Sequence, residues 1–182
     1  NGVAGMGWSL NGLSSLHRCP MTMEQDGQIK AVTLTDSDRL CLDGQRLVLM
    51  SGTYGAANAT YGTELDSFVR VTQLGGNLVS AATYFKVERK SGEIAWYGEA
   101  SGLSYNARVI PGGVTLPLTW MIRKVEDRVG NAMDYVYANH GEGETLIESI
   151  YYTGFGGSLG NRRVAFFYEA RPTGAGTNDL SS

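Results

Sequence analysis

The sequence has 182 residues, of which 42% are hydrophobic and 18% charged, so it can build a globular core and is not mainly disordered. Its formal charge of −3, with no run of Lys or Arg longer than a pair, offers no basic surface for nucleic acid or an anionic membrane. No apolar run approaches the length that spans a bilayer. The 25 glycines, spread without a fixed period, predict many turns between short strands.

The first part of the chain predicts a bend followed by two strands. Gly5 to Leu10 holds two glycines around a methionine and then a tryptophan, which predicts a tight bend. Leu13 to Cys19 is a β-rich run that Pro20 ends, because proline cannot donate to a central ladder. The next strand is predicted at Gln28 to Thr35, after a turn at Asp26-Gly27.

The clearest local structure is a β-hairpin between Asp36 and Leu49. Its two arms are Arg39 to Leu42 and Gln45 to Leu49. Between them stands Asp43-Gly44, a dipeptide that tolerates the positive φ angles of a two-residue type I′ turn.

The same plan repeats to the end of the chain, which predicts an all-β fold of antiparallel hairpins and meanders. Ser51 to Gly62 and Gly98 to Pro117 are rich in turn residues and are predicted to be loops. A helix at Asn77 to Ser91 is the weaker alternative, because its second half alternates with period two. Strands are predicted at Phe68 to Leu74, Tyr84 to Arg89, Ile94 to Gly98, Trp120 to Asp127, Ala132 to Tyr137, Leu146 to Tyr152 and Arg163 to Glu169, with hairpin turns at Ser91-Gly92 and Gly130-Asn131.

The only cysteines are Cys19 and Cys41, which form either a disulfide or two buried thiols. If they pair, the closed loop of about 23 residues would stabilise the fold by roughly 3 kcal/mol. A four-ligand zinc site would need both histidines, His17 and His140, and nothing in the spacing suggests one.

The residues could support calcium binding, a catalytic triad or sugar binding, and each of these has a purely structural alternative. Asp36, Asp38 and Asp43 could supply oxygen ligands to calcium, but their spacing is that of turn-capping aspartates. No Gly-x-Ser-x-Gly elbow frames a serine for a catalytic triad with His17 or His140. Tyrosines and tryptophans could form a sugar platform, yet most fall in strands where core packing explains them. We therefore expect no catalytic residue, no metal and no cofactor.

Several segments together resemble a known family. They are collinear from about Gly5 to Pro172 and are similar to the amino-terminal SpvB-type region of bacterial toxin-complex B components and Rhs/YD-repeat proteins. The matching segments are Gly7-Trp8-Ser9-Leu10, His17-Arg18-Cys19-Pro20, Asp36 to Val48, Thr153-Gly154-Phe155 and Tyr168 to Pro172. Asp127 to Asn131, followed by Tyr135-Val136-Tyr137, also resembles one YD repeat, whose acidic residue, Gly-Asn turn and paired tyrosines form a hairpin.

The resemblance implies a large, exported bacterial polypeptide whose sheet closes into a hollow shell around a carboxy-terminal toxin. The chain opens on Asn1-Gly2 without a methionine, so we expect it to be a piece of a longer protein. It should comprise one β-rich domain over residues 1–172 and a disordered tail over 173–182, and contribute structurally to a secreted or surface-bound shell. Its expected partners are the remainder of the parent, an encapsulated toxin segment or other toxin-complex subunits.

The alternative is an extracellular module that binds glycans or a partner protein through Ser51 to Gly62 and Gly98 to Pro117.

Overall fold

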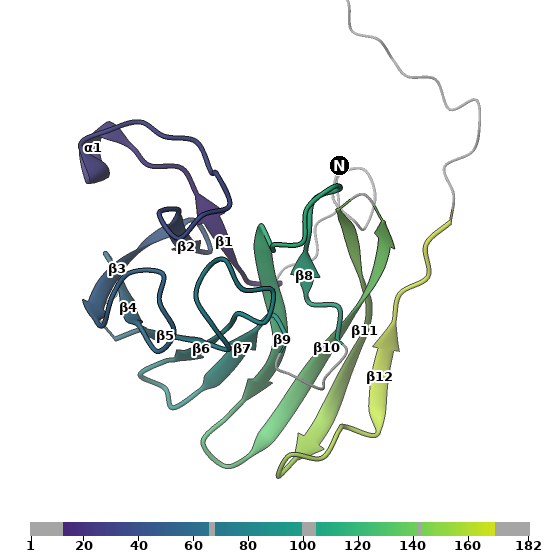
Figure 1. Cartoon of the computed structure of the whole chain (residues 1–182). Coiled ribbons are helices and arrows are strands. Elements are labelled where there is room, and N and C mark those ends of the chain that lie inside the picture. The colour runs from purple at the N-terminus through teal and green to yellow at the C-terminus, as the bar shows by residue number, and fades with distance from the viewer. Residues whose placement is uncertain (1–12, 66–67, 100–104, 142, 170–182) are drawn as a thin grey trace, which may run out of the picture.

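Antiparallel strands make up nearly all of the regular structure in a computed structural model of the chain, which describes residues 13–65, 68–99, 105–141 and 143–169 (Figure 1). The predicted all-β class is confirmed. The elements are β1 Ser15–Cys19, α1 Met23–Asp26, β2 Arg39–Leu42, β3 Gln45–Ser51, β4 Thr60–Thr63, β5 Arg70–Leu74, β6 Tyr84–Glu88, β7 Ile94–Tyr97, β8 Arg108–Val109, β9 Thr119–Glu126, β10 Asn131–Gly141, β11 Glu144–Phe155 and β12 Arg162–Ala165.

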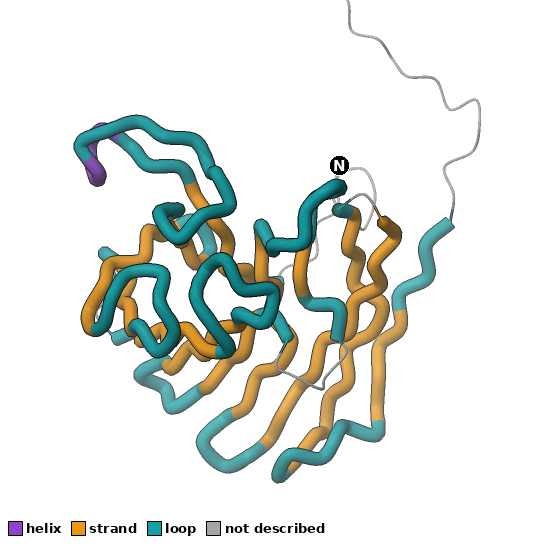
Figure 2. Tube along the Cα trace, in the orientation of Figure 1, coloured by secondary structure: helices purple, strands orange, loops and turns teal. Residues whose placement is uncertain are grey.

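Eight of the strands close into a ring. They follow the order β1-β2-β3-β4-β5-β6-β7-β9, and β9 pairs back with β1. Closure uses the first half of β9, where Met121, Trp120 and Thr119 lie opposite residues 15–17. Figure 2 shows the short helix α1, the one helix of the described residues, on the loop that follows β1 and away from the strands of the ring.

The second half of β9 carries the sheet beyond the ring. Residues 124–126 pair with the start of β10, and β10, β11 and β12 follow as antiparallel neighbours. We call these three strands the wing. In Figure 1 the wing extends to one side of the ring and ends at β12. The short strand β8 pairs with the first half of β9.

The core is one cluster that takes side chains from the ring and from β10 and β11 of the wing, and many of its largest members are aromatic. Trp120 packs edge-to-face against Phe85, with ring centroids 4.9 Å apart, and its indole Nε1 donates a hydrogen bond of 2.8 Å to the carbonyl oxygen of Thr83. The hydroxyl of Tyr137 donates to the carbonyl oxygen of Ile122 at 2.7 Å, which satisfies a polar group inside the core. Other fully buried side chains are Tyr61, Tyr97, Leu16, Leu40, Leu47, Leu78 and Ile147.

The predicted hairpin turns form as the residue chemistry requires. Asp43 and Gly44 join β2 to β3 with φ angles of 48° and 81°, the positive values of a type I′ turn. In the YD-like hairpin between β9 and β10, one carboxylate oxygen of Asp127 accepts hydrogen bonds of 2.9 Å from the backbone N–H groups of Val129 and Asn131. The aspartate therefore caps the turn, the role that the resemblance to a YD repeat implies.

The strand predicted at Gln28 to Thr35 is wrong. Only Lys30 pairs there, in an isolated bridge with Met21, and the helix α1 precedes the turn at Gly27. The rest is a loop because Thr33 and Thr35 bond to a nearby aspartate instead of to another strand.

The prediction that Ser51 to Gly62 is a loop is wrong at both ends, where Ser51 closes β3 and Thr60 opens β4. The predicted bend at Gly5 to Leu10 and the predicted tail over 173–182 lie outside the described residues.

Candidate functional site

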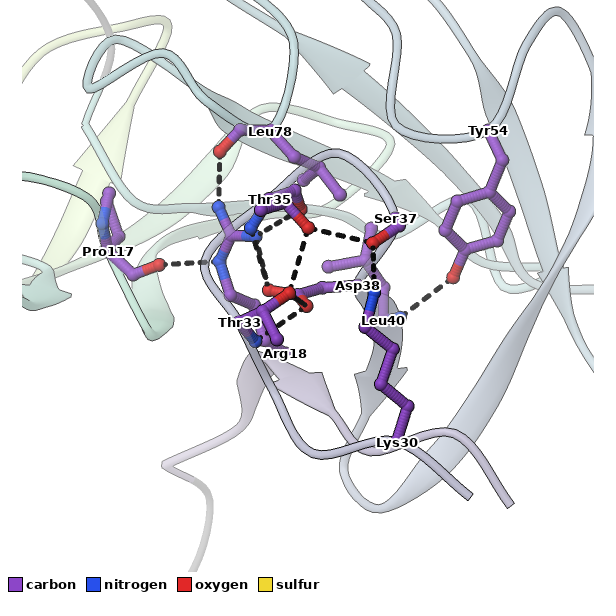
Figure 3. A network of polar contacts seen from close by, with 10 residues as sticks. All are labelled: Arg18, Lys30, Thr33, Thr35, Ser37, Asp38, Leu40, Tyr54, Leu78 and Pro117. Atoms are coloured by element: carbon purple, nitrogen blue, oxygen red, sulfur yellow. Dashed lines mark hydrogen bonds and ion pairs between the residues drawn. The ribbon is translucent and has the colours of Figure 1, made fainter. Parts of the chain in front are cut away.

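A buried guanidinium joins four segments at one end of the ring (Figure 3). Arg18, the fourth residue of β1, points inward beside Leu16, and its side chain is fully buried. Its Nε donates to the carbonyl oxygen of Pro117 at 2.9 Å, and its Nη1 donates to that of Thr35, also at 2.9 Å. Its Nη2 donates to the carbonyl oxygen of Leu78. The guanidinium thus ties β1 to three loops that are far apart in sequence.

The counter-ion of Arg18 is Asp38, which is equally buried. Oδ2 of Asp38 lies 2.9 Å from Nη1 of Arg18 and accepts a hydrogen bond of 3.2 Å from the N–H of Thr35. Oδ1 accepts from the N–H and the hydroxyl of Thr33 at 2.8 and 3.0 Å. Burial would raise the pKa of the Asp38 carboxyl, but the hydrogen bonds from Thr33 and Arg18 outweigh it and hold the pKa below its usual value. The network is fully bonded to protein atoms, so we interpret it as a structural support. We call Arg18, Asp38 and their bonding partners the brace.

A second buried network holds the loop between β3 and β4. The hydroxyl of Tyr61 donates to Oε1 of Gln73 at 2.8 Å and accepts from the N–H of Gly55 at 2.9 Å. Nε2 of Gln73 donates to the carbonyl oxygens of Gly55 and Gly76. Burial raises the pKa of Tyr61 to about 12. Tyr61 of β4 therefore belongs to the core and offers no surface to a ligand.

A third polar cluster fastens α1 to the ring. Asp26 of α1 binds Nε of Arg39 at 2.6 Å through one oxygen and Nη2 of Arg46 at 2.9 Å through the other. The guanidinium of Arg39 also lies 4.8 Å from the centroid of the Tyr54 ring. Beside these residues runs an open groove of about 560 Å³ whose lining includes Glu64, so the groove carries charges of both signs.

The two cysteines lie on neighbouring strands, with Cys19 in β1 and Cys41 in β2. Their Cα atoms are 5.9 Å apart and a disulfide joins them in the structure. Both residues are buried; Cys19 follows Arg18 in the sequence, and Cys41 lies opposite His17 in the strand pair. Oxidation of the pair in the protein itself stays a prediction.

The three candidate calcium ligands do not come together. Asp38 bonds to Arg18, while Asp43 caps the start of β1 by accepting from the hydroxyl of Ser14 at 2.6 Å and from the N–H of Ser15 at 2.9 Å. Asp36 is exposed. Among the described residues, no group of three or more His, Cys, Asp or Glu side chains is placed to hold a metal ion.

The two histidines occupy separate places. His17 is half-buried on β1 opposite Cys41, and burial lowers its pKa although the charge of Asp43 opposes that shift. His140 lies exposed on the wing, in β10. The described part of the chain also contains no helix that is long and apolar enough to cross a membrane.

The outer edge of β12 has no partner strand within the described chain. The N–H of Phe166 bonds inward to the carbonyl oxygen of Glu148 at 2.9 Å. Because inward and outward groups alternate along an antiparallel strand, the N–H groups of Arg163 and Ala165 face outward from the sheet. Phe167, which is 90% exposed, lies two residues after the end of β12. The edge thus offers hydrogen-bonding groups and an apolar side chain to another strand.

Sequence reasoning missed the brace and the second network. Arg18 could have been flagged, because it shares one face of its strand with Leu16, which puts a charge where the period-two pattern expects a core residue. Gln73 lies on the same face of β5 as Val71 and could have been flagged in the same way. The partners of Arg18 carry no comparable signal, since they lie in loops.

Several solved structures share this fold. The chain matches the crystal structure of TcdB2-TccC3-Cdc42 with a TM-score of 0.61 and 14% identity, over 81% of this chain and 8% of that one. It matches the Photorhabdus luminescens Tc holotoxin pore with a TM-score of 0.62 and 14% identity, over 81% and 8%. It matches the N-terminal domain of effector protein SpvB from Salmonella typhimurium strain LT2 with a TM-score of 0.58 and 16% identity, over 77% and 51%.

The chain therefore has an SpvB-like fold that also forms part of toxin-complex proteins, as the resemblance implied. It spans less than a tenth of the matched toxin-complex chains and about half of the matched SpvB chain. No protein-family model matches the sequence, and a search of curated proteins finds no similar one.

Proposed function

We propose that this chain is a non-catalytic structural segment of a secreted bacterial protein of the Rhs and toxin-complex type. Its sheet forms part of the wall of a β-shell that encapsulates a toxin and delivers it. Its partners are the remainder of the parent protein, the encapsulated toxin segment or other toxin-complex subunits.

The observation that carries this proposal is the open edge of β12. The ring is closed, so none of its strands needs a partner, but the wing ends in a strand whose outward N–H groups at Arg163 and Ala165 remain available. Such an edge favours addition of a further strand. The small fraction of the similar toxin-complex chains that this fold covers supports the same reading.

The polar networks support a structural role. Among the described residues, Arg18 and Asp38 are the most fully buried ion pair, and every partner of the guanidinium is a protein oxygen, drawn from three separate loops. Catalytic groups need instead to reach a reacting atom in a shared pocket. Neither His17 nor His140 makes a hydrogen bond to a serine or carboxylate in the described chain that would activate it as a base.

The test is to mix the chain with the portion of the parent protein that follows it and to measure complex formation by size-exclusion chromatography. Arg163→Pro removes an outward N–H without removing an inward one, so it should abolish the complex, whereas Arg163→Thr should keep it. A broad hydrolase screen on the same samples should show no turnover. Failure of the unmodified chain to bind, together with turnover that His17→Ala or His140→Ala removes, would replace the structural proposal with an enzyme.

A glycan-binding or protein-binding module is the second candidate function. One observation favours it: Tyr105, within the segment Gly98 to Pro117, borders a pocket lined by the buried Arg123, whose Nε has no hydrogen-bond partner.

A further inference from the structure

A pocket of about 360 Å³ lies where β7, β9 and β10 run side by side. Trp96 of β7 is paired with Lys124 of β9, and Lys124 is paired with Asp134 of β10, so the three side chains form a row on one face of the sheet. Tyr105 and Leu159, from loops on either side, complete the walls. The volume is in the range of small-molecule sites.

Arg123 supplies a buried cation to this pocket. The residue is only 6% exposed, and its Nε has no hydrogen-bond partner. Its guanidinium lies 5.6 Å from the centroid of the Tyr105 ring. Burial lowers the pKa of Arg123. This differs from Arg18, whose guanidinium is bonded through all three nitrogens.

Asp134 supplies a buried anion to the same pocket, and it has few hydrogen bonds, as Arg123 does. The residue is 4% exposed, and its one side-chain hydrogen bond comes from the hydroxyl of Tyr105 at a long 3.4 Å. It forms no ion pair with Arg123 within the described structure, and Lys124 is already paired with Glu126 at 2.8 Å. Two opposite charges therefore line one pocket with no ion pair between them in the described structure, and Nε of Arg123 has unused hydrogen-bonding capacity.

Such an arrangement selects its ligand by charge and by hydrogen bonding. Buried charged groups are normally satisfied by hydrogen bonds or by an opposite charge. An anion placed here would be opposed by Asp134, and a cation by Arg123 and Lys124. A neutral molecule that accepts a hydrogen bond at one atom and donates one at the next would satisfy both charged groups. Adjacent hydroxyl groups of a sugar do this, since each hydroxyl both donates and accepts.

We propose that this pocket binds a neutral monosaccharide unit, with one ring hydroxyl accepting from the guanidinium of Arg123 and a neighbouring hydroxyl donating to the carboxylate of Asp134. Trp96 and Tyr105 supply aromatic surface for the apolar side of the sugar ring. This site goes beyond the structural role proposed above and does not depend on it.

The test uses the 182-residue chain and three neutral hexoses, glucose, galactose and mannose, in ligand-observed saturation-transfer NMR. At least one hexose should show transfer, and Asp134→Asn and Arg123→Met should each weaken its binding at least tenfold. Arg70→Met, which changes an exposed arginine on β5, is the matched control and should bind like the unmodified chain. Thermal unfolding of each variant shows that the fold is kept; removing the unpaired charge of Arg123 should not harm it.

Two results would overturn the proposal. One is the absence of transfer from all three hexoses, or transfer that survives both pocket substitutions. The other is tighter binding of acetamide than of any hexose, because an amide also offers one donor and one acceptor. That outcome would assign the pocket to an asparagine or glutamine side chain of a protein partner.

Discussion

Nη1 of Arg18 and Oδ2 of Asp38 lie 2.9 Å apart, and the two side chains are 0% and 2% exposed. Arg18 also contacts the face of Trp120, with 5.5 Å between the guanidinium carbon and the ring centroid. The pair therefore connects the largest core side chain with the loop over residues 33–38. Because the ring closes between β1 and β9, a brace on β1 stabilises the closure itself.

Removal of one partner of this pair should be strongly destabilising. Asp38→Ala leaves the guanidinium of Arg18 buried without its counter-ion, so we expect a loss of about 3–5 kcal/mol in the free energy of unfolding. Urea denaturation followed by tryptophan fluorescence measures the loss. The control is Glu88→Ala, which removes the 38% exposed partner of Lys86 and should cost less than about 1 kcal/mol. Equal losses for the two variants would show that the brace contributes no more than a surface ion pair.

The stability contributed by Asp38 should disappear in acid. Its folded-state pKa is lowered, so the carboxylate stabilises the fold above the ordinary aspartate pKa of about 3.9, and this contribution is lost as the pH falls through the folded value. The stability difference between the unmodified chain and Asp38→Asn should shrink steadily below about pH 4. Urea denaturation at a series of pH values measures it. A difference that does not change with pH would contradict the assigned pKa direction.

Asp134 should show the opposite dependence. Burial raises the pKa of its carboxyl, and the positive charge of Lys124 offsets only part of the rise. The folded state therefore binds the proton of Asp134 more tightly than the unfolded state does. Above the folded-state pKa the charged carboxylate lowers the free energy of unfolding. This loss disappears as the pH falls below the unfolded-state pKa. Asp134→Asn should be more stable than the unmodified chain at pH 7, with a gain that vanishes in acid. A less stable variant at pH 7 would refute this.

The cysteine pair can be tested chemically. If Cys19 and Cys41 are oxidised, thiol titration of unfolded, unreduced protein should find no reactive thiol. Reduction should lower the free energy of unfolding by roughly 3 kcal/mol, the loop-closure entropy of the residues between them. Cys19→Ser combined with Cys41→Ser should lose a similar amount and become insensitive to reductant. Two fully reactive thiols in the untreated protein would leave two buried cysteines as the correct description.

Local chemistry was sufficient to predict most of the strands, although it missed β4 and β8. Asp43-Gly44 predicted a type I′ turn, and the φ angles of both residues have the positive sign that it requires. The alternation of Val69 and Val71 with polar neighbours predicted β5, and both valines are buried. Each of these signals lies within a few residues, so the sequence carries it whatever the rest of the fold does.

Long-range pairing could not be predicted in this way. β9 pairs with β1, β7, β8 and β10, and no local pattern in Thr119–Glu126 indicates which half meets which strand. The brace is similar, because Asp38 lies 20 residues from Arg18 and resembles any turn aspartate in sequence. The failed strand at Gln28 to Thr35 has the same cause. Its threonines are β-formers by propensity, but Asp38 captures the hydroxyl and N–H of Thr33.

We expect the edge of β12 to pair with a further strand of a larger protein. Amide hydrogen exchange at Arg163 and Ala165 tests it most directly, because their N–H groups face outward from the sheet. In the isolated chain these two amides should exchange quickly, whereas that of Phe166, bonded to Glu148, should be protected. In the full parent protein Arg163 and Ala165 should become as protected as Phe166. Fast exchange of both amides in the full parent protein would show that the edge of β12 has no partner strand there.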